Sequence, residues 1–320
     1  MRGRRIVFMG TAELACASLE SLVASPEFQV VAVVTQPDRP KGRALKLQPP
    51  PVKISASRLG LPVLQPERAR EPAFLEQLRR LDPDFVVVAA YGQLLPPAIL
   101  ELPPRGCVNV HASLLPKYRG AAPIQWAILN DEEQTGVTIM KIAEKLDAGD
   151  ILARRATPIA PDDTAATLHE RLARMGAELL LETLANCVNN TITACPQVEA
   201  EATYARKITK GDGRLDWSQP ARGLWNRVRA FTPWPGAFTT WPGGAPPRTV
   251  KIWRASVEPA QAGAPGEVLQ ADKTGIVVAC GSGALRIHEL QLEGGRPLPA
   301  TQFLIGHAMH PGERLGSSAK

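Results

Sequence analysis

The sequence predicts an α/β protein in which a doubly wound, mostly parallel sheet is followed by a small antiparallel β-barrel. Over residues 1–189, short apolar runs rich in β-branched residues alternate with helix-like segments, which is the pattern of a parallel sheet covered by helices on both faces. Beyond residue 206, short strands lie between Gly and Pro residues at close spacing, which is typical of a small antiparallel barrel or sandwich. At 320 residues the chain exceeds the usual size of one domain, so two domains are expected.

The elements of the first domain follow from short apolar runs bounded by Pro or Gly. Residues 5–10 (RIVFMG) indicate a buried strand that ends at Gly10, and residues 12–25 carry apolar side chains at helical spacing up to Pro26. The same reasoning predicts strands at residues 29–36, 84–92 and 107–113 and helices at residues 72–81 and 176–190. In such sheets, ligands bind beyond the carboxyl ends of the strands.

The second domain begins after an irregular stretch. Residues 190–206 lose periodicity and are predicted to link a domain at residues 1–189 to a domain at residues 207–320. Strands are expected there at residues 249–257, 266–272, 275–281 and 283–294. Trp usually buries most of its area, so we expect the Trp residues of this half to lie mainly in its core; they are Trp217, Trp225, Trp234, Trp241 and Trp253.

Composition places the chain among globular proteins without a membrane or secretory segment. Hydrophobic residues make up 44% and charged residues 21% of the chain, close to the globular average. No apolar run approaches the ~20 residues of a membrane span, and Glu13 interrupts the apolar segment near the start, so no signal peptide is expected. The five cysteines are scattered without a CxxC pair, which predicts buried thiols in a reducing compartment and no metal site. We therefore expect a cytoplasmic monomer with no membrane partner.

Positive charge is concentrated in the last third of the chain. The formal charge is +6, and residues 207–320 contain 14 basic and 8 acidic residues, whereas the first 206 residues contain 23 of each. A basic domain attached to a neutral one suits a polyanion such as nucleic acid, although a cationic surface that only promotes solubility fits the charge equally well. Candidate contacts in this region are Lys207, Lys210, Arg214, Arg227, Arg229, Lys251 and Arg254.

The first strand is followed by GTAELA rather than by a dinucleotide-binding loop. Gly10 is the only glycine of a G-x-G-x-x-G pattern present at this position, so the argument for phosphate binding fails. The sequence therefore disfavours a nicotinamide dehydrogenase and favours a tight strand-to-helix turn against which a substrate can pack.

Asn109 and His111 stand two residues apart at the end of a predicted strand. Side chains two residues apart project from the same face of a strand, so the amide and the imidazole can converge on one point. Such a pair suits a carbonyl whose oxygen becomes negative during acyl transfer. Taken alone, the pair favours the alternative of a hydrogen-bonded His at a strand end without a catalytic role.

Two acidic residues follow in the segment EKLDAGDIL. Asp147 and Asp150 bracket a Gly turn, and an Asp that faces His111 can relay a proton. The spacing permits either residue, and each alone is more typical of a turn. The sequence contains no G-x-S-x-G, no H-E-x-x-H and no Cys with a partner in sequence, which favours direct transfer over a covalent enzyme intermediate.

The segments NVHASLLPKYRGAAPIQWAI (109–128) and GVTIMKIAEKLDAGDIL (136–152) resemble the folate-dependent formyltransferases. Both the wording of the segments and their separation match the family, and the likeness runs from about Arg5 into the last strands. The members that act on methionyl-tRNA are matched in particular by GTAELACASLESL, VVTQPDRPKGR, VVAAYGQLLP and RAFTPWPGAF. The chain departs from the family at GTAEL, where GTPEF is usual, and this difference concerns the first turn.

The resemblance implies transfer of a formyl group from 10-formyltetrahydrofolate to the amino group of the methionyl moiety of initiator methionyl-tRNA, without a metal. It implies a Rossmann-like catalytic domain and an OB-like barrel that binds tRNA. The catalytic residues that it implies are Asn109 and His111, which stabilise charge on the formyl oxygen, and Asp147, which holds His111 and moves a proton. The folate-binding residues that we assign on this likeness are Ser113, Leu114, Leu115, Pro116, Tyr91, Gly92, Gln93 and Leu94.

A long basic segment, residues 36–53, is predicted to be structureless. Beside the active site it becomes a candidate for gripping the acceptor stem through phosphates, whereas alone it fits a solvated loop equally well. Its basic residues are Arg39, Lys41, Arg43, Lys46 and Lys53.

Two other functions are alternatives. A formyltransferase for a nucleotide sugar or a purine precursor would share Asn109, His111 and Asp147 but should lack the basic loop and the basic barrel. A nucleic-acid-binding module with an inactive α/β half would not require the complete set of three residues. The sequence contains both basic regions and the complete set, so it favours transfer to tRNA.

Overall fold

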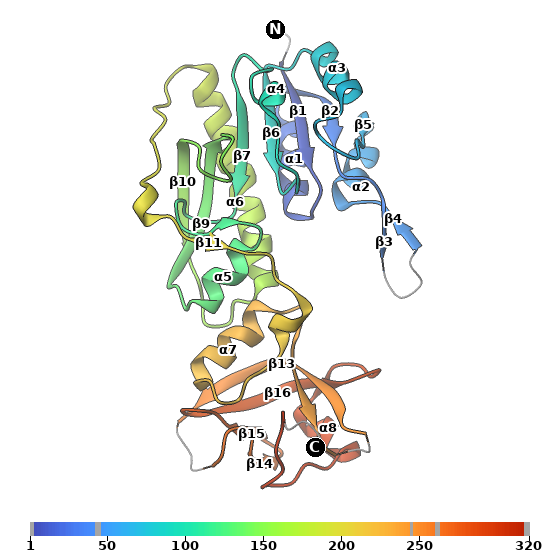
Figure 1. The fold of residues 1–320 in the computed structure, drawn as a ribbon, viewed down its shortest axis with the longest axis vertical. Coiled ribbons are helices and arrows are strands. Elements are labelled where there is room, and N and C mark those ends of the chain that lie inside the picture. Colours follow the sequence, from blue (N-terminus) through green and yellow to red (C-terminus); the bar gives the residue numbers. More distant parts are fainter. Residues whose placement is uncertain (1–2, 42–45, 244–245, 260–262, 317–320) are drawn as a thin grey trace. The chain divides into compact units, whose positions relative to one another are not determined.

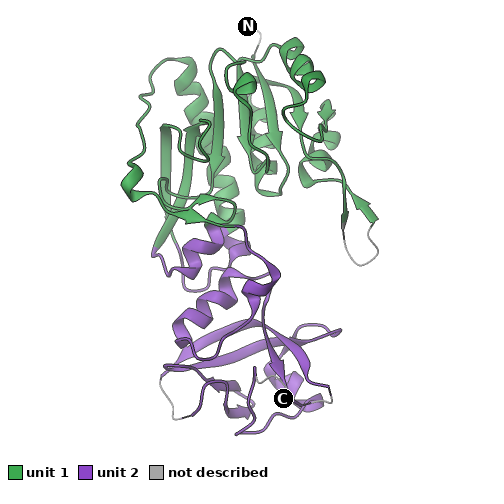
Figure 2. Ribbon diagram, viewed as in Figure 1, with its two compact units in different colours: residues 1–123, 134–158, 169–206 green, residues 124–133, 159–168, 207–320 purple. Residues whose placement is uncertain are grey.

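The computed structural model describes residues 3–41, 46–243, 246–259 and 263–316, and the chain divides into two compact units (Figure 2). Unit 1 comprises residues 1–123, 134–158 and 169–206, and unit 2 comprises residues 124–133, 159–168 and 207–320. The predicted linker at residues 190–206 thus belongs to unit 1. A domain boundary close to residue 207 stays our proposal.

A mixed seven-stranded sheet forms the centre of unit 1, in the order β10-β9-β7-β6-β1-β2-β5 (Figure 1). The strands β7, β6, β1, β2 and β5 are parallel, whereas β9 runs antiparallel to both of its neighbours. The prediction of a doubly wound, mostly parallel sheet is confirmed. The strands are β1 (Arg4–Gly10), β2 (Phe28–Val34), β5 (Val63–Leu64), β6 (Phe85–Ala89), β7 (Cys107–His111), β9 (Gln134–Lys141) and β10 (Ile151–Pro158).

Helices occupy most of the connections between these strands. Four of them, α2, α3, α4 and α5, begin with Pro, whose missing N–H leaves no bond unmade at this position. Helix α6 begins well before its predicted start at residue 176. Gly176 allows this helix to pack closely on β7, since a β carbon at this position would lie 2.9 Å from the side chain of Val110. The helices are α1 (Leu14–Ala24), α2 (Pro51–Arg58), α3 (Pro72–Leu81), α4 (Pro97–Leu100), α5 (Pro123–Leu129) and α6 (Ala165–Val188).

Burial on both faces of the sheet explains why its strands are continuous apolar runs. All five residues of β6 are buried, as expected for a central parallel strand. Val86 and Val88 of this strand belong to one core cluster with Phe74 and Leu78 of α3. Full burial of such a side chain contributes roughly 1.5–3 kcal/mol, so this packing fixes the strands whose ends carry the site.

The loops that follow β1, β2 and β6 are tied together at the carboxyl edge of the sheet. The Thr11 hydroxyl donates to the Tyr91 carbonyl at 2.8 Å, and the Gln36 amide donates to the same carbonyl at 2.9 Å. Chain order reverses between β1 and β6, and ligands bind at such a switch point in open α/β sheets.

The basic segment 36–53 is more ordered than predicted. Strands β3 (Arg39–Lys41) and β4 (Lys46–Gln48) pair antiparallel and project away from the main sheet of unit 1, and α2 follows at Pro51 (Figure 1). Asp38 anchors the base of this hairpin, because its carboxylate accepts from Lys53 at 2.8 Å and from Gln65 at 2.8 Å. Strands of three residues are too short to show a period, which is why periodicity did not predict them.

Unit 2 is built on an antiparallel sheet in the order β12-β13-β16-β15-β14, with β17 beside β16. The chain near its end links the two edges of this sheet: Val268 of β14 donates to Glu313 at 2.8 Å, and Gly316 donates to Thr240 of β12 at 2.8 Å. The elements are α7 (Ala221–Ala230), β12 (Ala237–Trp241), β13 (Arg248–Glu258), β14 (Val268–Asp272), β15 (Gly275–Ala279), β16 (Ala284–Leu292), β17 (Leu298–Pro299) and α8 (Ala300–Gly306). Short elements of the chain include β8 (Arg119–Gly120), β11 (Tyr204–Ala205), η1 (Glu199–Glu201) and η2 (Lys210–Gly213).

The core of unit 2 contains most of its Trp side chains, as predicted. Trp217 and Trp241 are buried and Trp225 packs against the same cluster. Trp253 is half-buried and lies outside this cluster, and Trp234 is 51% exposed. Trp234 lies in the Pro-rich turn after α7.

The prediction of buried thiols holds for only some of the cysteines. Cys107 and Cys280 are buried, Cys16 and Cys187 are half-buried, and Cys195 is exposed because it lies on the irregular segment 190–206. Burial raises the pKa of Cys107 to about 12.

Among the described residues, none of the helices combines the length and the apolar character of a membrane span. The same residues contain no group of three or more His, Cys, Asp or Glu side chains arranged to hold a metal ion.

Candidate active site

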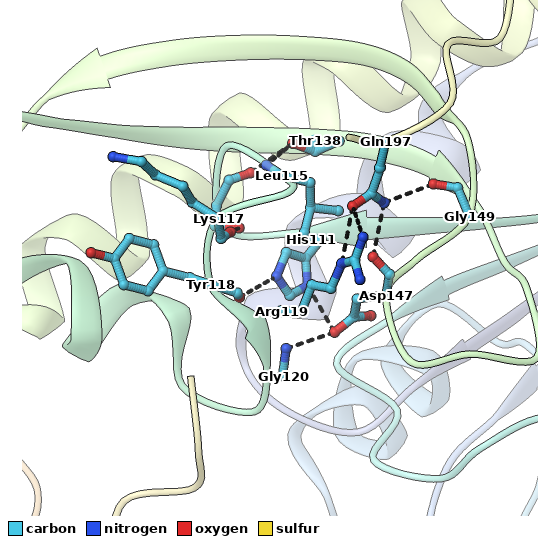
Figure 3. A network of polar contacts seen from close by, with 11 residues as sticks. His111, Leu115, Lys117, Tyr118, Arg119, Gly120, Thr138, Asp147, Gly149 and Gln197 are labelled. Carbon is cyan, nitrogen blue, oxygen red and sulfur yellow. Dashed lines mark hydrogen bonds and ion pairs between the residues drawn. The ribbon is translucent and has the colours of Figure 1, made fainter. Parts of the chain in front are cut away.

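His111 lies at the carboxyl end of β7 with its imidazole almost completely buried. Its Nε2 atom is 2.9 Å from the carbonyl oxygen of Tyr118 (Figure 3). A carbonyl can only accept, so Nε2 carries the hydrogen of this bond. The ring is thereby fixed, and its Nδ1 edge faces Asp147.

Asp147 lies 3.7 Å from His111, measured between Oδ2 and Nδ1. The same Oδ2 accepts a hydrogen bond from the backbone N–H of Gly120 at 2.8 Å (Figure 3), and only 15% of the side chain is exposed. The sequence left Asp147 and Asp150 as alternatives, and the structure brings Asp147 to the imidazole. The backbone carbonyl of Asp150 instead accepts a hydrogen bond from the backbone N–H of Lys141.

Asn109 occupies the strand position two residues before His111, paired with Val88 of β6 and Met140 of β9. Side chains at this spacing share one face of the strand, as the sequence predicted for the amide and the imidazole. Asn109 is half-buried, and its amide makes no side-chain hydrogen bond with the described part of the chain. An amide donor is therefore available on the face of β7 that carries His111.

The residues assigned to folate differ in how accessible they are. After β6, Gly92 is exposed and Leu94 is 70% exposed, whereas the Tyr91 ring is buried in the core, which raises its pKa to about 12. Gln93 uses its side chain to hold the backbone of Ala69 and Glu67. Gly92 and Leu94 are thus the members of this loop that a ligand can reach.

The other assigned segment, SLLP, is mostly internal. Ser113, Leu115 and Pro116 are buried and Leu114 is half-buried. The Ser113 hydroxyl donates to the Lys117 carbonyl at 2.6 Å, and Thr138 of β9 bonds to the backbone of both Ser113 and Leu115. This segment shapes the loop after β7, and its contact with folate stays a proposal.

The candidate RNA contacts are mostly exposed. Lys46, Lys207, Lys210 and Arg214 are exposed, and Arg39 is exposed with Glu67 3.9 Å away. Arg43 lies outside the described residues, as does the side chain of Lys41.

Arg229 does not fit an RNA contact. Its side chain is buried, and the guanidinium donates to the carbonyls of Ala160 and Asp163 at 3.2 Å and to Asn226 at 2.7 Å. It lies in a short basic helix, where the sequence does not distinguish an inward Arg from an outward one.

Two family models match the chain in succession. The model of the formyl transferases matches residues 4–184, and the model of the formyl transferase C-terminal domain matches residues 207–308. The chain belongs to the formyl transferase family. The predicted resemblance is therefore confirmed.

Full-length relatives of this formyltransferase share half of its residues. A protein of Geobacter metallireducens named methionyl-tRNA formyltransferase is 50% identical over 316 residues, which are 99% of this chain and 100% of the relative. A protein of Citrifermentans bemidjiense with the same name is also 50% identical, over 99% of this chain and 98% of the relative.

Solved structures share the fold of the formyltransferase at lower identity. HypX from Aquifex aeolicus in complex with tetrahydrofolic acid is 20% identical, with a TM-score of 0.60 over 95% of this chain. The match spans 47% of HypX, so the formyltransferase corresponds to about half of that protein.

Two residues beside the candidate catalytic residues were not predicted from the sequence. Arg119 donates to the side chain of Gln197, and Gln197 in turn donates to the carbonyl of Asp147 (Figure 3). Arg119 follows Tyr118 in the matching motif, and Gln197 lies in the supposed linker. No local pattern marks either residue, because their contacts join segments 78 residues apart.

Proposed function

We propose that this formyltransferase transfers the formyl group of 10-formyltetrahydrofolate to the amino group of the methionyl moiety of initiator methionyl-tRNA, as a monomer in the cytoplasm. The observation that carries the proposal is the 50% identity to a methionyl-tRNA formyltransferase over the full length of both chains. An enzyme for a sugar or a purine precursor needs to share only the catalytic residues. Identity that extends through the basic residues 207–320 favours the RNA-linked acceptor.

The accessible residues of the site suit a folate. Leu94 presents an exposed apolar side chain and Gly92 leaves its backbone open on the loop after β6. Ligand sites combine such apolar surface with a few polar groups that fix orientation, and Asn109 supplies one. When bound, the folate would supply an electrophilic formyl group.

The three polar side chains divide the chemistry among them. The Asn109 amide donates to the formyl oxygen as this oxygen gains charge, which is where one fixed donor lowers the barrier by about 3 kcal/mol. The carbonyl of Tyr118 accepts a hydrogen bond from Nε2 of His111, so Nδ1 of His111 and the carboxylate of Asp147 transfer the proton of the attacking amine. The amine forms a new C–N bond with the formyl carbon and loses a proton. The bond from the formyl carbon to the folate nitrogen then breaks, and His111 and Asp147 return the proton to that nitrogen.

The proposal is tested by comparing acceptors in one assay. The protein and 10-formyltetrahydrofolate are incubated in parallel with initiator methionyl-tRNA, an amino sugar nucleotide and the amine of a purine precursor. We expect formylmethionyl-tRNA as the main product. His111→Ala and Asp147→Ala should each slow its formation by about 100-fold or more, with tRNA affinity nearly unchanged. Faster formylation of another acceptor would overturn the assignment of substrate, and normal turnover in either variant would overturn the assignment of catalytic residues.

A further inference from the structure

Arg119 is a buried cation beside the catalytic pair whose role the proposed chemistry leaves open. Its side chain is completely shielded from solvent. The guanidinium donates through Nε and Nη2 to the side-chain oxygen of Gln197, at 3.1 and 2.9 Å, and through Nη1 to Glu199 at 2.8 Å. Burying a charge is costly unless it is paired and hydrogen-bonded. The three residues Arg119, Gln197 and Glu199, here called the Arg119 cluster, meet that condition.

Gln197 connects this cluster to the turn that carries Asp147. Its amide nitrogen donates to the carbonyl of Asp147 at 2.8 Å and to the carbonyl of Gly149 at 2.7 Å (Figure 3). Asp147 has a φ of 48°, a left-handed conformation that residues other than Gly adopt only at single positions. Two hydrogen bonds from one amide therefore hold a backbone conformation that the turn does not favour by itself.

The backbone around Arg119 contacts both members of the catalytic pair. Tyr118 accepts from His111, and Gly120 donates to Asp147. Residues 203–205 hold this backbone from the other side, because the backbone N–H of Arg119 donates to the carbonyl of Thr203 at 2.8 Å. Gly120 packs so closely on Ala205 that a β carbon on Gly120 would lie 2.7 Å from the Ala205 carbonyl oxygen. The segment from Tyr118 to Gly120 is thus held between the catalytic pair and residues 203–205.

Glu199 completes the cluster at the solvent side. Hydrogen bonds, first from Lys145 and to a smaller extent from Arg119, hold the pKa of Glu199 below its ordinary value. The carboxylate therefore stays ionised opposite the buried guanidinium. Lys145 also lies just before Asp147 in the chain, and its ion pair with Glu199 joins the two segments a second time.

We propose that Arg119 and Gln197 are positioning residues that set the separation of Asp147 from His111, and that residues 195–205 are part of the active site rather than a linker. Arg119 orients the Gln197 amide, and Gln197 fixes the turn of Asp147. Loss of this alignment lowers the rate of the chemical step, since a displacement of about 1 Å can cost 100-fold in catalysis. The role in catalysis rests on the proposed function.

A double-mutant cycle between Gln197 and Asp147 tests the proposal. The variants Gln197→Glu, Asp147→Ala and the double variant are assayed for kcat and for the KM of each substrate. Gln197→Glu keeps the size of the side chain and its acceptor for Arg119 but removes the N–H groups that hold the turn. We expect it to lower kcat by about 10–100-fold, with each KM changed by less than about 3-fold. In the Asp147→Ala background the same change should have almost no further effect, because the two residues act as one unit.

Gln29→Glu is the matched control, because it makes the same change at an exposed position near the start of β2, outside residues 195–205, and it should keep the wild-type kcat. Thermal unfolding of every variant identifies loss of fold, and Gln197→Met provides a second variant if Gln197→Glu does not fold. A wild-type kcat in the Gln197 variant, or fully multiplicative losses in the cycle, would overturn the proposal. The cycle is run with whichever acceptor the wild type formylates, so failure of the proposed substrate is recognised separately.

Discussion

At the scale of single residues, Asn109 and His111 are held in different ways. The imidazole is fixed by the Tyr118 carbonyl on one side and faces Asp147 on the other, whereas the Asn109 amide bonds to no other side chain of the described residues. A half-buried amide without such a bond adds little to stability. Its use is therefore to be sought in a ligand.

Replacement of Asn109 should consequently separate activity from stability. Asn109→Ala is expected to lower kcat by about 100-fold or more, the usual cost of one oxyanion donor, and to change the free energy of unfolding by about 1 kcal/mol or less. Formylation kinetics and denaturant unfolding measure the two effects. Asn189→Ala, which removes an exposed amide just after α6, should alter neither. Retained activity in the Asn109 variant would mean that the amide does not contact the formyl oxygen.

At the scale of elements, predictions from periodicity held for several buried strands, although they missed β9 and placed the start of α6 too late. The runs that became β1, β6, β7 and β16 were each predicted within a few residues of their observed bounds, because burial on one or both faces imposes a regular apolar pattern. The same rule explains two of the failures. Strands β3 and β4 are too short to show a period, and residues 190–206 are irregular, yet hydrogen bonds to distant segments order them.

The hairpin of β3 and β4 is the element that we expect to contact RNA in unit 1. Lys46 is exposed at the start of β4, and Lys46→Glu should weaken tRNA binding and reduce the slope of log affinity against log salt by about 0.7–0.9 for each phosphate that is no longer neutralised. Titrations at several salt concentrations measure this slope. Arg174→Glu, an equal change of charge at an exposed position of α6, serves as control. Identical slopes for the two variants would show that the hairpin does not grip phosphates.

At the scale of the whole molecule, the sequence predicted the fold class, and it also supplied the candidate pair Asn109 and His111, because each depends on local patterns. A strand followed by a turn places Asn109 and His111 together wherever the rest of the chain lies. Recognition of Arg119 and Gln197 requires knowledge of which distant segments meet, and buried polar contacts leave no period in a sequence. Charge could be predicted only in part. The net charge of residues 207–320 follows from the sequence, whereas the burial of the Arg229 side chain does not.

The concentration of positive charge in the last third of the chain predicts that RNA binding and chemistry respond to different variants. Lys210→Glu combined with Arg214→Glu should raise the KM for methionyl-tRNA and flatten its salt dependence, because a protein that neutralises fewer phosphates releases fewer counterions on binding. At saturating tRNA the kcat should stay within about 2-fold of wild type, since loss of binding shared by ground and transition states leaves kcat unchanged.

Steady-state kinetics at two or more salt concentrations test this separation. Lys273→Glu combined with Arg296→Glu gives the same change of net charge at two other exposed positions of residues 207–320 and should have a smaller effect on KM. A fall in kcat equal to the change in kcat/KM would show instead that Lys210 and Arg214 contribute to the chemical step, because an interaction made only in the transition state lowers both quantities together.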